Sequence, residues 1–172
     1  SAFQIVGVRN KPYGDYILNK DITMTDDLPY NGGTLYGELD LQGHTLTNTR
    51  LTGGVFENIG SAAKKQGAIR NGTIQFQAIR STGDNNIYPF TYSNYGTLEN
   101  LNFKVNVQNP YSSSGGEKIY DNSRWNSEQY SNMIRNNYGT LRNFTLEYQA
   151  NLLSCYGTGF IWDNIGLVQN GY

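Results

Sequence analysis

The 172-residue sequence predicts an all-β fold in which parallel strands from successive repeats stack on one another. Three observations support this prediction: a turn-rich uncharged composition, a recurring template, and alternation of apolar with polar residues. The chain carries 22 Asn, 20 Gly and 14 Tyr, but only 16% of its residues are charged. Asn and Gly favour left-handed turn positions and Tyr favours strands. Long stretches with helical spacing are missing, so the composition favours strands and turns over a helical bundle.

A short template recurs along the chain, most clearly in NYGTLEN (residues 94–100) and NYGTLRN (residues 137–143). It reads Asn-x-Gly-x-apolar-x-Asn, with a further apolar residue three positions after the second Asn. The asparagines and glycines that fit it are Asn71, Asn94, Gly96, Asn100, Asn137, Gly139, Asn143, Asn164, Gly166 and Asn170. A looser early copy starts at Gly43. We expect the template glycines to supply positive φ at tight corners, and the second template asparagine, as at Asn100, to form a ladder of buried amides.

Apolar and polar residues alternate after each template, as expected for strands with one buried face. Residues 101–107, LNFKVNV, are an example. A repeat of about 25 residues that contains short strands and no helix cannot bury its own apolar side chains, so successive repeats must stack. The sequence therefore predicts a right-handed parallel β-helix, a solenoid of about six coils. We expect one domain over residues 1–172, with one long polar loop insertion at residues 108–132.

The overall charge argues against two classes of partner. The formal net charge is -1 and the pI is about 5.8, so nothing attracts the chain to nucleic acid or to an anionic membrane surface. No apolar run approaches the roughly 20 residues of a membrane-spanning helix, and from residues 1–3 we expect no signal peptide in this sequence. Cys155 is the only cysteine, which excludes an internal disulfide. We predict neither a nucleic-acid partner nor direct membrane insertion, and we expect an excerpt of a larger protein.

The residues that could carry catalysis are scattered through the sequence. His44 is the only histidine, and in the expected stack it lies too far from Cys155 to form a nucleophile–base pair. The sequence has no HExxH, CxxC or EF-hand motif, so no metal or cofactor is predicted. Outward-facing carboxylates are expected at Glu38, Asp40, Glu99, Glu147 and Asp163. The template aligns Glu99 with Arg70 and Arg142, which is typical of ion pairs between stacked strands and disfavours catalysis.

The insertion at residues 108–132 is the strongest candidate for binding. Long loops on stacked repeats often carry function. Its aromatic and basic side chains suit sugar rings or a protein partner; the predicted binding residues are Tyr111, Tyr120, Arg124, Trp125 and Tyr130. The alternative is that these aromatic residues fold back and cover one face of the stack. The sequons at Asn71 and Asn143 follow from the template and give little support for glycosylation.

Four segments carry a resemblance to a known family: residues 16–22, LYGELDLQGHTLTN (35–48), GGVFENIG (53–60) and GAIRNGTI (67–74). Together they resemble the GLUG-motif repeats of bacterial secreted and cell-surface proteins. In that family the repeats belong to large secreted or wall-attached proteins, including regions beside immunoglobulin A-specific metallopeptidases. The resemblance implies an extracellular, noncatalytic module and names no ligand.

Three functions remain open at the level of sequence. The first is a noncatalytic module of a bacterial surface or secreted protein, acting as spacer and as an adhesion platform for a glycan or a host or matrix protein. The second is a polysaccharide-processing enzyme on the same fold. The third is a phage receptor-binding tail fragment that trimerises. We favour the first and expect an extracellular or cell-surface location.

Overall fold

The computed structural model describes residues 1–50, 53–78, 88–108, 133–151 and 160–172. Most of these residues lie in strands, as the composition predicts. The element bounds are α1 (Ala2–Gly7), η1 (Val8–Asn10), β1 (Tyr16–Ile17), β2 (Ile22–Met24), β3 (Thr34–Leu35), β4 (Glu38–Asp40), β5 (Thr45–Asn48), β6 (Phe56–Ile59), β7 (Ala68–Ala78), β8 (Thr91–Asn94), β9 (Thr97–Gln108), β10 (Ile134–Asn137), β11 (Thr140–Asn151), β12 (Ile161–Asn164) and β13 (Leu167–Gly171).

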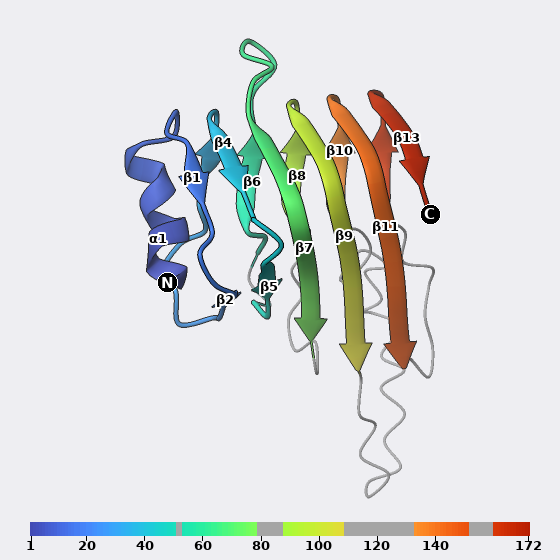
Figure 1. Cartoon of the computed structure of the whole chain (residues 1–172), viewed down its shortest axis with the longest axis horizontal. Coiled ribbons are helices and arrows are strands. Elements are labelled where there is room, and N and C mark those ends of the chain that lie inside the picture. The colour runs from blue at the N-terminus through green and yellow to red at the C-terminus, as the bar shows by residue number, and fades with distance from the viewer. Residues whose placement is uncertain (51–52, 79–87, 109–132, 152–159) are drawn as a thin grey trace, which may run out of the picture.

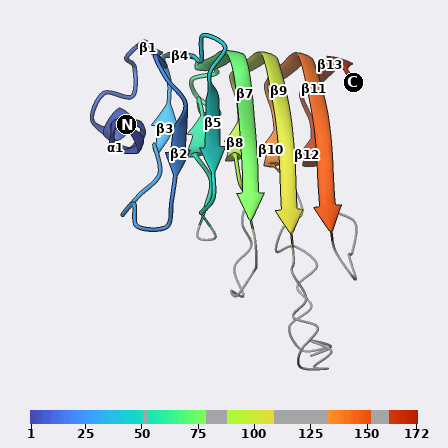
Figure 2. The same cartoon turned by 60° about the horizontal axis from the view of Figure 1, so that its bottom comes forward.

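The strands form two sheets, and the strand pairs of the described residues are all parallel (Figure 1). Sheet A has eight strands in the order β1-β4-β7-β9-β11-β13, with β5 pairing both β2 and β7. Sheet B has five strands in the order β3-β6-β8-β10-β12. Turning the molecule shows the long strands β7, β9 and β11 side by side, with β8, β10 and β12 behind them (Figure 2). The prediction of an all-β fold with parallel strands is therefore confirmed.

Equivalent template residues pair with one another across sheet A. Leu141 of β11 pairs with Leu98 of β9, and Leu98 pairs with Ile69 of β7. Leu39 of β4 continues the same row. All four side chains are buried, so one apolar row passes through successive repeats. The alignment read from the template is thus correct from β7 to β13.

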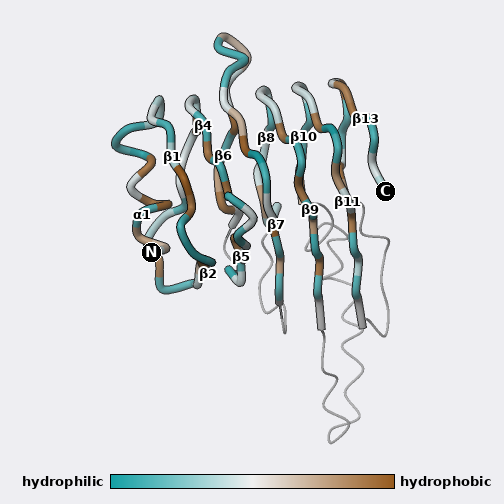
Figure 3. Tube along the Cα trace, viewed as in Figure 1, coloured by the Kyte–Doolittle hydropathy of each residue, from teal (hydrophilic) through white to brown (hydrophobic). Residues whose placement is uncertain are grey.

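The apolar core lies between the two sheets. Its aromatic part joins Phe103 of β9 to Phe90 and Phe160, which precede β8 and β12, with ring centroids 5.9 and 4.8 Å apart. Phe144 of β11 packs on Phe160 at 5.6 Å. Apolar and polar segments alternate along the strands (Figure 3). Since aromatic pairs at these separations add to the energy of burial, this cluster ties the two sheets together.

The corner that leads from sheet B to sheet A explains why the template contains glycine. Gly96 and Gly139 each connect two strands there, and neither has a positive φ. A Cβ on Gly139 would lie 2.1 Å from the carbonyl oxygen of Gly96, and a Cβ on Gly166 would lie 2.1 Å from that of Gly139. The predicted positive φ holds for Gly43 and Gly67, and the expectation was wrong for Gly96, Gly139 and Gly166. Close approach of successive backbones requires glycine at this corner.

Positive φ occurs instead at the second asparagine of the template. The φ angles are 63° at Asn71, 54° at Asn100, 52° at Asn143 and 53° at Asn170. Asn tolerates this left-handed region better than other residues with a side chain. Three of these residues lie inside the long strands β7, β9 and β11, where they bend each strand without ending it. We call this position the asparagine bend.

The early template copy that starts at Gly43 was assigned the wrong register. Gly37, and not Gly43, is equivalent to Gly67, because Glu38 pairs with Ala68 in the adjacent strands. Gly43 lies at the asparagine bend, where its N–H donates to the carbonyl of Asn71. This repeat carries two extra residues at the bend, which interrupts the strand between β4 and β5. The insertion shifted the sequence alignment away from the true corner.

The two ends of the stacked sheets differ (Figure 1). At the first end, α1 and η1 place Ile5 and Val8 in the core. The sequence analysis missed α1, because six residues are too few for a helical pattern to stand out. At the other end β13 is exposed along its length, with Leu167 at 51%. In the described part of the chain, no helix is long and apolar enough to span a membrane.

Candidate functional site

Two columns of asparagine side chains run across the repeats, and the first is structural. At the glycine corner, Nδ2 of Asn94 donates to Oδ1 of Asn137 at 2.9 Å, and Nδ2 of Asn137 donates to Oδ1 of Asn164 at 2.8 Å. Asn94 and Asn137 are fully buried. Since a buried amide needs hydrogen-bond partners, the column satisfies its own members. The ladder of buried amides that was expected at the second template asparagine therefore forms at the first one, in this corner column.

The second column lies at the asparagine bend and faces solvent. Nδ2 of Asn170 donates to Oδ1 of Asn143 at 3.0 Å, and Nδ2 of Asn100 donates to Oδ1 of Asn71 at 3.2 Å. Nδ2 of Asn71 donates to Asp40 at 3.2 Å. All four asparagines are exposed, so the expected burial was wrong for this bend column. Each amide keeps hydrogen-bonding capacity that a ligand could use, since one amide offers two donors and two lone pairs.

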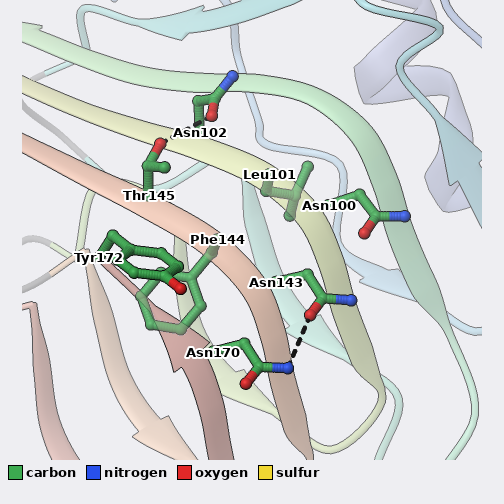
Figure 4. A pocket seen from close by; sticks show the side chains of 8 residues that line it. All are labelled: Asn100, Leu101, Asn102, Asn143, Phe144, Thr145, Asn170 and Tyr172. Carbon is green, nitrogen blue, oxygen red and sulfur yellow. Dashed lines mark hydrogen bonds between the residues drawn. The ribbon is translucent and has the colours of Figure 1, made fainter.

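A groove of about 500 Å³ opens beside this bend column on the outer side of sheet A. Its lining residues are Asn100, Leu101, Asn102, Asn143, Phe144, Thr145, Asn170 and Tyr172. Figure 4 shows the amides of Asn143 and Asn170 joined along one edge and the rings of Phe144 and Tyr172 at the other side. We call this hollow the asparagine groove.

The asparagine groove combines exposed amides with an apolar surface. The hydroxyl of Thr145 donates to Oδ1 of Asn102 at 2.7 Å, which holds that amide in place. Leu101 and Phe144 belong to the buried core, so the apolar surface that a ligand can reach is the ring of Tyr172, which is 90% exposed. The lining contains no ionisable side chain other than the Tyr172 phenol. An uncharged lining with paired amides and an aromatic ring suits the hydroxyl groups and apolar ring faces of a neutral saccharide.

A charged row runs across the same sheet next to the bend column. Arg70 binds both Glu38 and Glu99, and Nε of Arg142 donates to the second oxygen of Glu99 at 2.6 Å. Burial of the Glu99 carboxylate raises its pKa, but the hydrogen bonds and charges of Arg142 and Arg70 outweigh that effect, so the pKa lies below its ordinary value. The predicted ion pairs between stacked strands are confirmed. Both oxygens of Glu99 are occupied, which favours a structural role.

The other candidate chemical groups lie apart. Nδ1 of His44 lies 3.3 Å from the carboxylate of Asp21, which is exposed. The backbone N–H of Thr45 donates to the same carboxylate, and this hydrogen bond, together with the contact to His44, lowers the pKa of Asp21. Glu147 pairs with Lys104 at 3.5 Å. The described residues contain no group of three or more His, Cys, Asp or Glu side chains that could hold a metal ion.

The predicted binding residues of the insertion lie outside the described residues, as does Cys155; these binding residues are Tyr111, Tyr120, Arg124, Trp125 and Tyr130. Sequence reasoning identified three groove residues, Asn100, Asn143 and Asn170, but assigned them to the repeat alone. It missed Asn102 and Thr145. These two occupy the same position, two residues after the second template asparagine, which was a usable signal for a surface row.

Comparison with protein-family models, curated protein sequences and solved structures finds no match. The resemblance to GLUG-motif repeats stays a prediction.

Proposed function

We propose that this chain is a noncatalytic module of a bacterial surface or secreted protein, built as a right-handed parallel β-helix of about six coils related to GLUG-motif repeats. In-register parallel pairing from β4 to β13 supports this architecture. Such a column resists bending, because each strand is hydrogen-bonded to the repeats on both sides. The module holds a binding surface away from the rest of its parent protein and so acts as spacer and adhesion platform.

The ligand that we propose for the platform is a neutral glycan, and the asparagine groove is the observation that carries the proposal. Its amides repeat along the stack at the spacing of neighbouring strands, about 4.8 Å. A chain of sugar units could therefore lie along the column and meet an equivalent amide at each repeat. Asn102, braced by Thr145, would give the most directed hydrogen bond.

The groove favours binding over polysaccharide cleavage. Cleavage of a glycosidic bond uses two carboxyl groups that flank it, and the groove lining contains none. Glu99 and Arg142, which are adjacent in sequence to Asn100 and Asn143, already bind each other, and Lys104 binds Glu147. A host or matrix protein is the remaining alternative ligand, and the experiment below separates it from a glycan.

The test is a screen of immobilised neutral oligosaccharides and matrix proteins, followed by isothermal titration of any ligand found. We expect Asn102→Ala to weaken binding about tenfold, as the loss of about 1.4 kcal/mol from one hydrogen bond predicts. Asn106→Ala is the matched control, since it removes an amide from the same strand outside the groove. Its affinity should match that of the unmodified chain.

A second variant replaces residues 108–132 with a Gly-Ser linker. Retained glycan binding supports the groove as the site. Loss of all binding in this variant, with Asn102→Ala unaffected, would transfer the function to the insertion and overturn the groove assignment. Binding to a matrix protein alone would overturn the glycan assignment.

A further inference from the structure

The outer face of sheet B carries a row of aromatic and basic side chains at equivalent positions. Asn136 pairs with Ser93 and Asp163, so Arg135, Tyr92 and Trp162, one residue before each, lie opposite one another in β10, β8 and β12. Tyr92 is 46% exposed and Trp162 is 42% exposed, which places them on the outer face, because the residues beside Tyr92 are buried. This face lies on the sheet opposite to the asparagine groove.

Arg135 lies at the centre of this row and contacts aromatic rings on both sides. Its Cζ lies 4.8 Å from the ring centroid of Trp162 and 5.7 Å from that of Tyr88. Tyr88 in turn meets the ring of Tyr92 edge-on at 5.5 Å. A guanidinium over aromatic faces is held by cation–π attraction, which fixes the orientation of the cation. We call Tyr88, Tyr92, Arg135 and Trp162 the arginine–aromatic face.

Arg135 differs from the arginines of sheet A in its partners. Arg70 and Arg142 both bind Glu99. Among the described residues, no carboxylate forms an ion pair with Arg135, and its Nη1 is a buried donor without a hydrogen-bond partner. A buried cationic N–H that lacks a partner is costly, and such a group in a folded protein calls for an explanation such as an ion or a ligand.

The neighbouring carboxylates of the described residues do not pair with Arg135. Asp163 is next in sequence to Trp162 but lies in the row of Asn136 and Ser93, on the opposite side of the strand. Glu57 belongs to the outer row but lies two strands away from Arg135, about 10 Å at the usual strand spacing. The arginine–aromatic face is therefore a positive site flanked by exposed rings.

We propose that the arginine–aromatic face binds an acidic saccharide through a carboxylate on one of its sugar units, a uronic acid. The carboxylate accepts hydrogen bonds from Arg135, which is the geometry guanidinium groups favour. The apolar faces of the sugar rings pack on Tyr92 and Trp162. These two side chains are two strands apart, about 10 Å, so they contact successive sugar units and not one ring. This site is independent of the asparagine groove and takes a charged ligand, whereas the groove takes a neutral one.

The test compares oligogalacturonate with its methyl ester, because the two have the same sugar rings but the ester carries a neutral methyl ester group in place of each carboxylate. Binding is followed by the fluorescence of Trp162 in a Trp125→Phe background, so that only one tryptophan reports. We expect the ester to bind at least about tenfold more weakly, since a hydrogen bond between charged groups contributes about that much. Arg135→Gln should bind both forms equally weakly. Trp162→Ala, measured by titration calorimetry, should weaken both forms.

Arg142→Gln is the matched control, since it removes an arginine from sheet A, and its affinity for the acid should be unchanged. Equal binding of the acid and the ester, or unchanged binding by Arg135→Gln, would overturn the proposal. Binding of a glutamate oligopeptide as tight as that of oligogalacturonate would also overturn it and assign the face to an acidic protein segment. Asn102→Ala should leave oligogalacturonate binding intact, so failure of the groove and failure of this face are distinguishable.

Discussion

The glycine corner and the asparagine bend both turn the chain once in each repeat and both carry an asparagine column, yet different forces hold them. At the corner, the amides of Asn94 and Asn137 are buried and bond only to protein groups. At the bend, the amides of Asn100 and Asn143 are exposed and their residues have positive φ. The same residue type is thus used once for its side-chain hydrogen bonds and once for its backbone freedom.

Asparagine therefore recurs in each repeat with two different structural roles, one at the corner and one at the bend. A buried amide that loses its partner costs the full desolvation of the group left behind, whereas an exposed amide turns to water. A backbone at positive φ restricts which residue may stand there, whatever the side chain binds. The following five changes test these effects, beginning with the one expected to cost most.

Gly139→Ala should destabilise the fold most, by about 3 kcal/mol or more. The new Cβ would lie 2.1 Å from the carbonyl oxygen of Gly96, and the backbone of Tyr95 and Gly96 in the adjacent repeat cannot move away without disturbing the strand pairs there. Urea unfolding followed by circular dichroism measures the loss. Gly53→Ala is the control, because a Cβ at Gly53 meets nothing within 4 Å. Equal stability of both variants would show that the corner is not crowded.

Asn137→Ala should cost about 2 kcal/mol, because it leaves the buried Nδ2 of Asn94 without its bond to Asn137, whereas the exposed Asn164 can bond to water instead. The same unfolding experiment measures it. A cost below about 1 kcal/mol would mean that water replaces the lost amide and that the corner column is not sealed.

A triple substitution to leucine sharpens that test. In the first repeats the same row is occupied by Leu35 and Ile59, which pair in register and are fully buried, and Ile59 pairs with Asn94. Replacing Asn94, Asn137 and Asn164 together removes every amide of the column, so no side-chain amide stays unpaired, although the backbone N–H of Gly96 loses its bond to Oδ1 of Asn94. We expect the triple variant to be more stable than Asn137→Ala, since apolar replacement of all partners can be nearly neutral.

Asn143→Ala should cost about 1–2 kcal/mol, the usual penalty for an ordinary residue in the left-handed region. Asn143→Gly is the matched comparison, because glycine adopts the observed φ of 52° without strain. The glycine variant also loses the hydrogen bond that Asn170 donates to Asn143, but this bond is exposed, so its loss should change the free energy of unfolding little. If the alanine and glycine variants unfold at the same urea concentration, the amide and not the backbone determines the role of the bend.

Glu99→Gln should have the smallest effect at neutral pH, under about 1 kcal/mol, because the ion pairs are partly exposed. The pKa of Glu99 is lowered in the folded chain, so its contribution is fully present above the ordinary value of 4.5 and is lost as the pH falls through the lower folded value. Melting temperatures between pH 7 and pH 3 should therefore fall less for Glu99→Gln than for the unmodified chain. Parallel curves would contradict this linkage.

Sequence reasoning predicted the sheet alignment well where the repeats have equal length. Leu98 and Leu141 pair as expected because both follow the same template at the same distance. The alignment failed at Gly43, where two extra residues enter the bend and only the backbone pairing reveals Gly37 as the true equivalent. The helix α1 was not predicted for a similar reason, since a helix of six residues is too short to show a periodic hydrophobic pattern.

The candidate site was less predictable than the fold. The asparagine groove depends on side chains such as Asn102 and Thr145, which belong to different repeats and meet only because β9 and β11 pair. The arginine–aromatic face has the same origin, because Tyr92, Arg135 and Trp162 are far apart in the sequence. The spacing of residues within one segment of the sequence cannot predict which side chains of different repeats become neighbours.

By itself, the sequence determined that parallel strands would stack in register, because alternation and the asparagine–glycine template are local properties that each repeat carries alone. Only the tertiary structure decided which asparagine column is buried, why Gly139 must lack a side chain, and where Arg135 meets its aromatic neighbours. The physical reason is that burial and crowding are set by the backbone of the adjacent repeat, which no single stretch of sequence contains.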